Sequence, residues 1–109
     1  CSKLDGRWFG APPTSNCGLC VPCMVRRATF LRADVPDGTT YVVDQVAEDQ
    51  RRQLIEARRG DIEAVKYAVT GGVSSDAIDA GTWPPGYDLD RVEDLVQRGL
   101  DELGMLSLP

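Results

Sequence analysis

The run Asn16-Cys17-Gly18-Leu19-Cys20-Val21-Pro22-Cys23 organises the first third of this chain. It places three cysteines at intervals of two residues, and together with Cys1 these are all the cysteines in the protein. Two-residue spacers let a tight turn bring successive sulfurs together around one metal ion. The glycine suits such a turn because it adopts positive φ without steric cost, and Pro22 suits the start of a helix. We therefore predict that Cys1, Cys17, Cys20 and Cys23 are the ligands of a metal site.

Structural zinc is the chemistry that we favour for these thiols. Zinc accepts four thiolates and releases about 10–16 kcal/mol when it binds small peptides, which is enough to organise a loop-rich segment. Three alternatives stay open. An iron–sulfur cluster also uses cysteines spaced by two residues, although the usual fourth cysteine close behind the triplet is absent. Four cysteines can also form two disulfides in a secreted chain, and C-x-x-C pairs occur in thioredoxin-like redox sites.

Length and composition indicate one small globular domain. The chain has 109 residues, of which 42% are hydrophobic and 27% are charged. No apolar run approaches the roughly 20 residues of a membrane span, so we expect a soluble, cytoplasmic protein that does not contact a membrane. The chain starts at Cys1 without an initiator methionine or a signal-like segment, which we interpret as a piece of a longer protein.

Charge is distributed unevenly along the chain. Residues 1–34 carry five basic and two acidic side chains (+3), whereas residues 35–109 carry seven basic and fifteen acidic ones (−8). Four thiolates around one zinc leave two negative charges, which we expect Arg26, Arg27, Lys3 and Arg7 to balance. A sharper hypothesis is that Arg26 and Arg27 contact a nucleotide or substrate. The net charge of −5 makes nucleic acid an unlikely partner, because nucleic-acid binding relies on a positive surface.

Hydrophobic spacing predicts a mainly α fold, with a zinc-binding segment and first helix over 1–34 and a helical region over 35–109. Helices are expected over 21–32, 42–58, 61–70, about 75–78 and about 90–106. Gly60 and Asp61 are the expected boundary between the second and third helices, and Asp90 with Glu93 is the expected capping box of the last. We also expect Trp8 and Phe9 to cover the metal and Trp83 to pack on the core.

The sequence holds no recognisable catalytic machinery. It has no histidine, no phosphate-binding P-loop and no G-x-S-x-G motif, so nothing in it indicates nucleotide hydrolysis or acyl transfer. The acidic residues Asp88, Asp90, Glu93 and Asp94 are more typical of a solvated helix face than of a catalytic pair. We therefore assign no catalytic residue to this chain.

A resemblance to a known family adds to this interpretation. The run C-G-L-C-V-P-C-M-V-R-R-A over residues 17–28, preceded by a separate cysteine, resembles the C-terminal zinc-binding region of the 7-cyano-7-deazaguanine synthase (QueC-like) family. It is most similar to the QueC-like proteins of bacterial defence systems, in which a C-G-x-C-x-P-C-x-x-R-R-A run precedes helices. Fifteen residues separate Cys1 from Cys17, which is a longer gap than in the biosynthetic synthases. The second arginine and the acidic helical tail follow the defence-type relatives, which leaves the particular substrate open.

The resemblance implies that this chain is the C-terminal part of a larger α/β ATP-dependent synthetase. Such an enzyme adenylates a carboxyl-bearing deazapurine with ATP bound by an upstream phosphate-loop domain, and then brings nitrogen to it. Carried over by position, it implies zinc ligation by the four cysteines and a motif arginine at Arg26, with the upstream α/β domain or a partner subunit as the implied partner. The alternatives are an autonomous zinc-stabilised interaction module and, third, an iron–sulfur or redox protein.

Overall fold

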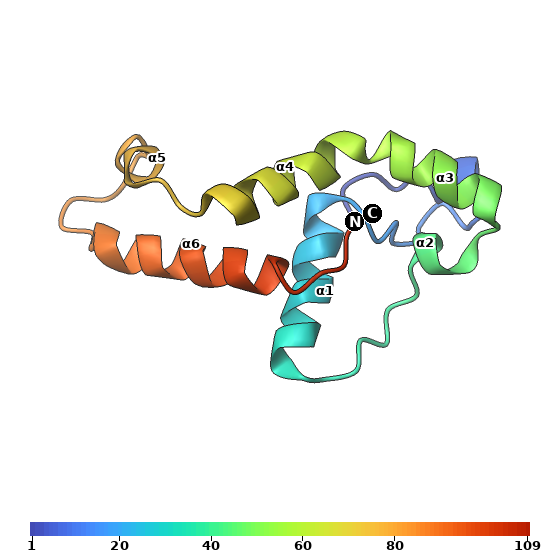
Figure 1. Cartoon of the computed structure of the whole chain (residues 1–109), viewed down its shortest axis with the longest axis horizontal. Coiled ribbons are helices and arrows are strands. Elements are labelled where there is room, and N and C mark those ends of the chain that lie inside the picture. The colour runs from blue at the N-terminus through green and yellow to red at the C-terminus, as the bar shows by residue number, and fades with distance from the viewer.

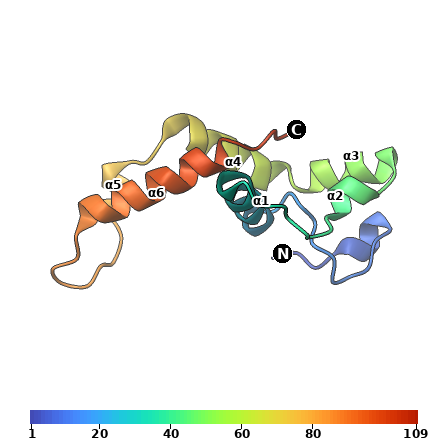
Figure 2. The ribbon, with the colours of Figure 1, turned by 90° about the horizontal axis from the view of Figure 1, so that it is seen from below.

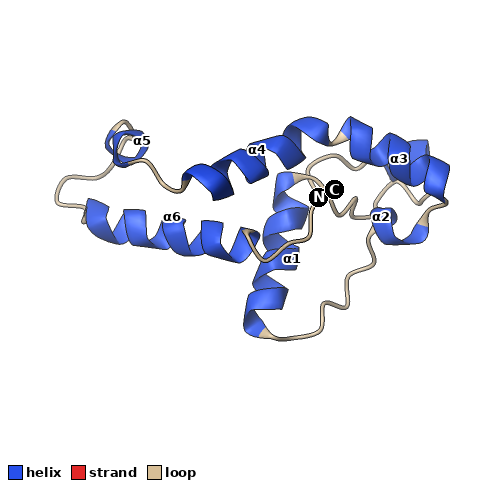
Figure 3. Ribbon diagram, in the orientation of Figure 1, coloured by secondary structure: helices blue, strands red, loops and turns tan.

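The computed structural model describes all 109 residues and confirms the mainly helical class, with 59% of the chain in helices and no strands (Figure 3). A short 3₁₀ helix, η1, precedes the α-helices. The elements are η1 (Gly6–Phe9), α1 (Val21–Ala33), α2 (Val42–Gln45), α3 (Glu48–Ala57), α4 (Arg59–Gly71), α5 (Ser75–Asp79) and α6 (Leu89–Leu103). None of these helices has the length and apolar character needed to cross a membrane.

The molecule is elongated, with extents of 49 × 28 × 24 Å. Helix α1 lies across its middle, and α6 packs on α1, α4 and α5 (Figure 1). Figures 1 and 2 both place α5 and the outer end of α6 at one extremity, and η1, α2 and α3 at the other. The two ends are therefore joined by α1, by the paired helices α4 and α6, and by the C-terminal segment, whose Leu108 packs against the buried residues of the cysteine end.

The hydrophobic core lies at the cysteine end of the molecule. Ten buried side chains pack together there: Phe9, Cys17, Leu19, Cys20, Cys23, Tyr41, Val42, Val43, Leu54 and Ile62. Three of the ten are cysteines, so the predicted metal ligands are part of the core itself. A metal bound by these sulfurs would act at the point where η1, α1, α2, α3 and α4 contribute to one cluster.

A short pairing of two extended segments shapes the cysteine turn. Asn16 and Tyr41 form an isolated parallel bridge, in which the backbone N–H of Val42 donates to the carbonyl of Asn16 over 2.9 Å. Gly18 has the positive φ predicted from the sequence, +90°, and a β-carbon at this position would lie 2.7 Å from Val43. A side chain is therefore excluded at Gly18 by the backbone conformation and by the close approach of the paired segment.

The prediction of one helix over 42–58 is wrong, because the chain forms two helices there. α2 ends before Val46, and Val46 and Ala47 are both extended, with ψ of 158° and 159°. The bridge at Tyr41 fixes the start of α2 against the cysteine turn, whereas α3 contributes Leu54 to the same core. The break lets both segments reach this cluster, which a straight helix of that length does not allow.

Three predicted helix boundaries are also wrong. Gly60 does not end a helix; α4 already begins at Arg59, and Arg58 joins it to α3 without a glycine break. The last helix is capped by Asp88 instead of Asp90, because the Asp88 carboxylate accepts a hydrogen bond from the backbone N–H of Arg91 over 3.3 Å. The last helix also ends at Leu103, three residues before the predicted end. The predicted extents of α1 and α5 hold to within one residue, and Ser74 caps α5 by accepting a hydrogen bond from the backbone N–H of Ala77.

The expectations for the tryptophans are corrected by the structure. Phe9 is buried in the cysteine cluster as expected, but Trp8 is 71% exposed and covers nothing there. Trp83 packs away from the core, where it donates a hydrogen bond to the carbonyl of Ile78 over 2.7 Å and stacks on Tyr87. Phe9, the neighbour of Trp8, packs in the core, and Trp8 is left exposed to solvent.

Candidate metal centre

The four cysteines reach one point from three structural contexts. Cys1 comes from the N-terminal segment, and Cys17 immediately follows the residue that pairs with Tyr41. Cys20 is the N-cap of α1, and Cys23 lies in its first turn, which Pro22 helps to start. The backbone thus brings the triplet together by a turn and a helix start, whereas Cys1 depends on the path of residues 2–16.

The sulfur positions fit a single four-coordinate metal ion. All four Sγ atoms lie within 4.8 Å of one another, and those of Cys1 and Cys20 are 3.8 Å apart. A tetrahedral site with metal–sulfur bonds of about 2.3 Å has sulfur–sulfur edges of about 3.8 Å. All four thiols are free, and Cys17, Cys20 and Cys23 are buried. This cluster can hold a metal ion such as zinc, whereas an iron–sulfur cluster would fill the centre and hold the ligand sulfurs further apart.

Backbone hydrogen bonds and thiol chemistry prepare the cluster for a cation. The N–H of Cys20 donates to Cys17 Sγ over 3.2 Å, and the N–H of Cys17 lies 3.5 Å from Cys1 Sγ. A hydrogen bond from the Cys23 thiol lowers the pKa of Cys17 despite its burial, and the same contact together with burial raises the pKa of Cys23. A metal displaces these protons, so metal binding releases protons and weakens as pH falls.

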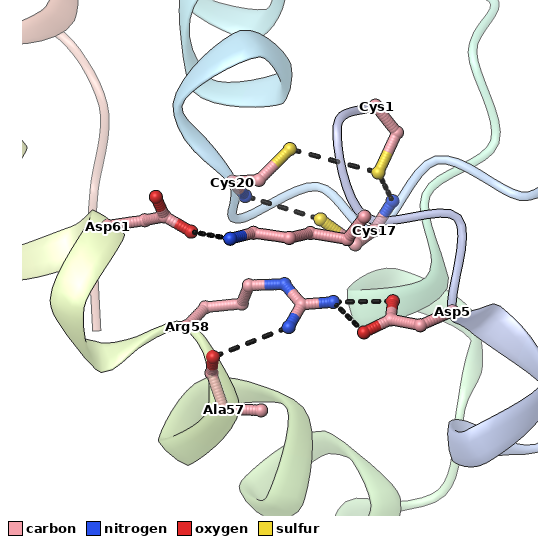
Figure 4. Close-up of polar contacts among 8 residues, drawn as sticks. Cys1, Asp5, Cys17, Cys20, Ala57, Arg58 and Asp61 are labelled. Carbon is pink, nitrogen blue, oxygen red and sulfur yellow. Dashed lines mark hydrogen bonds and ion pairs between the residues drawn. The ribbon is translucent and has the colours of Figure 1, made fainter.

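A buried arginine lies directly behind the cysteine cluster. Arg58 is only 4% exposed and is the one charged side chain among the buried residues. Figure 4 draws its contacts with Asp5 and Ala57 together with cysteines of the cluster. Arg58 Nη2 contacts both carboxylate oxygens of Asp5, at 2.5 and 2.6 Å, and its Nη1 donates to the carbonyl of Ala57. Burial alone would lower the pKa of Arg58, but Asp5 and Cys17 outweigh it and raise that pKa above its ordinary value.

Sequence reasoning missed Arg58 and Asp5 as neighbours of the site. The positive charges expected there were those of Arg26, Arg27, Lys3 and Arg7, and none of these is buried in the core. One signal was present in the sequence, because Leu54, Arg58 and Ile62 follow one another at intervals of four. Helical periodicity therefore placed Arg58 on the same inward face as two core residues, where a charged group needs a specific partner.

The structure places Arg26 and Arg27 on α1 beside the cysteine turn, each with an acidic neighbour. Arg26 Nε donates to Thr39 Oγ1 over 2.8 Å and lies 3.7 Å from the Asp37 carboxylate. Arg27 Nη1 donates to the carbonyl of Gly18, and its guanidinium lies over the Tyr41 ring. Arg27 also lines a cleft of about 580 Å³ between α1, the 35–41 segment and residues 105–108.

Comparison with known proteins leaves the site to be judged on its own geometry. No protein-family model, curated protein or solved structure matches this chain. The four sulfurs, their backbone donors and the buried arginine behind them are therefore the observations on which an assignment of function depends.

Proposed function

We propose that this chain is the zinc-binding C-terminal region of a QueC-like ATP-dependent synthetase, with Cys1, Cys17, Cys20 and Cys23 as the ligands of a structural zinc. The proposal rests foremost on the cluster of four free thiols within 4.8 Å. The resemblance over residues 17–28 adds the family. Zinc holds the N-terminal loop, the start of α1 and the paired segment at Tyr41 together, and the chain contributes no catalytic group.

Zinc is preferred among metals because the donor set is all thiolate and closed. Four cysteines saturate a tetrahedral ion and leave no open position for water or substrate, which is typical of structural and not catalytic zinc. The cluster is also built into the core, so the binding free energy of the ion stabilises the fold of this end of the chain.

Exposed apolar side chains support a larger parent over an autonomous module. Val25, Leu31 and Val35 are exposed along and after α1, and Leu95, Val96 and Met105 are exposed on and after α6. An autonomous module is expected to cover such groups, whereas a region that packs on an α/β domain in its parent leaves them bare when it stands alone. Val25 and Val96 line one hollow, and Leu31, Val35 and Met105 line another, so these side chains offer that domain two apolar places to pack.

The first test is metal analysis of the purified 109-residue chain together with its absorption spectrum. We expect one zinc per chain and no visible band. Iron with a brown chromophore would overturn the zinc assignment in favour of electron-transfer chemistry, and a metal-free chain with two disulfides would overturn the metal site altogether.

The family assignment is tested separately in the full-length parent enzyme. We expect it to release AMP only when ATP, a carboxyl-bearing deazapurine and ammonia are all present, because adenylation releases pyrophosphate and AMP leaves only when nitrogen displaces it. We expect Arg26→Ala to lower this activity without loss of zinc. Arg32→Ala, on the exposed side of the same helix, is the matched control and should leave the rate unchanged. If Arg26→Ala has no effect, the arginine only balances charge; if no deazapurine supports AMP release, the family assignment fails.

A further inference from the structure

The charge of the proposed centre requires a positive neighbour inside the protein. Four thiolates and one divalent ion carry a net charge of −2, and three of the four sulfurs are buried. In a buried site such a charge is poorly solvated by water, so groups outside the ligands usually stabilise it and orient them.

Arg58 is the cation that the structure offers. Lys3, Arg26 and Arg27 are partly exposed, and each lies near a carboxylate at the surface. The Arg58 guanidinium is buried and lies over the Phe9 ring, at 5.7 Å from its centroid, and Phe9 packs in the same buried cluster as Cys17, Cys20 and Cys23.

One edge of the Arg58 guanidinium is left without a partner. Asp5 and the carbonyl of Ala57 engage the two terminal nitrogens, but Nε is buried and has no hydrogen-bond acceptor. A buried guanidinium N–H without a partner is costly, and charged thiolates next to it would offset that cost. Asp5 therefore fixes the position of the Arg58 side chain, and its Nε–H remains available to interact with the thiolates of the cluster (Figure 4).

The backbone of Arg58 links this charge to the helices. Its N–H donates to the carbonyl of Leu54 over 3.1 Å, and its own carbonyl accepts from the N–H of Ile62 over 2.9 Å. Arg58 is thus the joint between α3 and α4, and Leu54 and Ile62, to which its backbone is hydrogen-bonded, belong to the core.

We infer that Arg58 is an outer-shell residue of the metal centre: it neutralises thiolate charge beside Cys17 and couples metal binding to the order of the α3–α4 corner. This inference rests on the proposed metal site. The site then includes Arg58, which lies 41 positions after Cys17. Metal binding is therefore expected to order the α3–α4 corner around Arg58, although that corner supplies no ligand.

The test measures zinc affinity of the 109-residue chain by competition with a chelator. Arg58→Met keeps the length of the side chain but removes its charge, and we expect it to weaken zinc binding about 10–100-fold. Arg58→Lys keeps the charge but not the planar guanidinium. Its zinc affinity is expected to lie between those of the wild-type chain and Arg58→Met. The matched control is Arg59→Met, because Arg59 is the next residue and its side chain is 69% exposed; its affinity should stay within twofold of wild type.

Hydrogen exchange of the amides of residues 54–62, with zinc and with chelator, measures the coupling. Zinc should slow exchange at this corner in the wild-type and Arg59→Met chains, and much less in Arg58→Met. A purely structural role for Arg58 would instead speed exchange equally in both states and leave zinc affinity unchanged, which would overturn the inference.

The outcomes separate this inference from the proposed function. Wild-type zinc binding with an unaffected Arg58→Met variant overturns only the role of Arg58, whereas a wild-type chain that takes up no metal overturns both. If Arg58→Met loses its helical circular dichroism even with zinc, Arg58→Gln, which keeps hydrogen-bond donors but carries no charge, takes its place, and wild-type zinc affinity in that folded variant would overturn the role of Arg58.

Discussion

The cysteine end of the molecule and the α5–α6 end are both helical, but they bury their side chains to different degrees. The cysteine end holds ten buried residues in one cluster, contributed by segments from Phe9 to Ile62. At the other end only Ile78 and Val92 are buried, although α6 has the clearest amphipathic pattern in the chain. A strong helical pattern therefore predicted the helix, but not what covers its apolar face.

The two regions are stabilised by different interactions. At the cysteine end, distant segments meet around sulfurs, so a bound metal adds its binding free energy to the fold. At the α5–α6 end, stability depends on helix capping and on contacts with α4 and α1, and Leu95 and Val96 of α6 remain exposed. Substitutions should therefore have large effects in the first region and small effects in the second.

The largest effect is expected from Cys20→Ser. It removes a buried ligand at the N-cap of α1, so zinc stoichiometry should fall well below one and several of the about 10–16 kcal/mol supplied by a structural zinc should be lost. Thermal melting with and without chelator measures this. Val21→Ser changes the next residue without removing a sulfur and should keep its zinc. Retained stoichiometry and unchanged melting in Cys20→Ser would refute the ligand assignment.

A matched pair of leucines compares the two regions directly. Leu54 is 0% exposed in the core, and Leu54→Ala should cost about 2–5 kcal/mol in urea unfolding of the zinc-loaded chain. Leu95 is 61% exposed on α6, and Leu95→Ala should change stability by about 0.5 kcal/mol or less. Equal costs would show that α6 is covered in solution, for example by a second copy, and would remove the contrast between the ends.

A smaller effect is expected at the start of α6. Asp88→Ala removes the carboxylate that accepts the Arg91 N–H, which should cost about 0.5–2 kcal/mol and reduce protection of the first turn in hydrogen exchange. Asp90→Ala, two residues further on, lacks that role and should change stability less. The reverse order would restore the capping box expected from the sequence.

The smallest effect concerns the pair Tyr41–Asp37. The hydrogen bond from the Tyr41 hydroxyl lowers the pKa of Asp37, while burial and this carboxylate raise the pKa of Tyr41 to about 12. The Asp37 contribution is therefore present above pH about 4 and lost as pH falls below it, and the Tyr41 contribution is lost as pH rises from about 10 through 12. Tyr41→Phe should flatten both limbs of the stability–pH curve, and a curve identical to that of wild type would contradict the pairing.

Much of the candidate site could be predicted because its ligands are close in sequence. The C-x-x-C-x-x-C spacing, the positive φ of Gly18 and the helix start at Pro22 are local properties of a few consecutive residues. The long-range part could not be predicted in the same way. Arg58 and Asp5 are 53 positions apart, and only the joint between α3 and α4 brings them together behind Cys17.

Local sequence therefore predicts the cysteine turn, the helical class and most helix positions, because sulfur spacing and apolar periodicity act over one or two turns of chain. The tertiary structure alone decided that helix 42–58 breaks at Val46, that Phe9 and not Trp8 enters the core, and that Arg58 is the buried cation. These outcomes depend on which surfaces compete for one small core, and that competition is settled by packing among distant segments rather than by local preference.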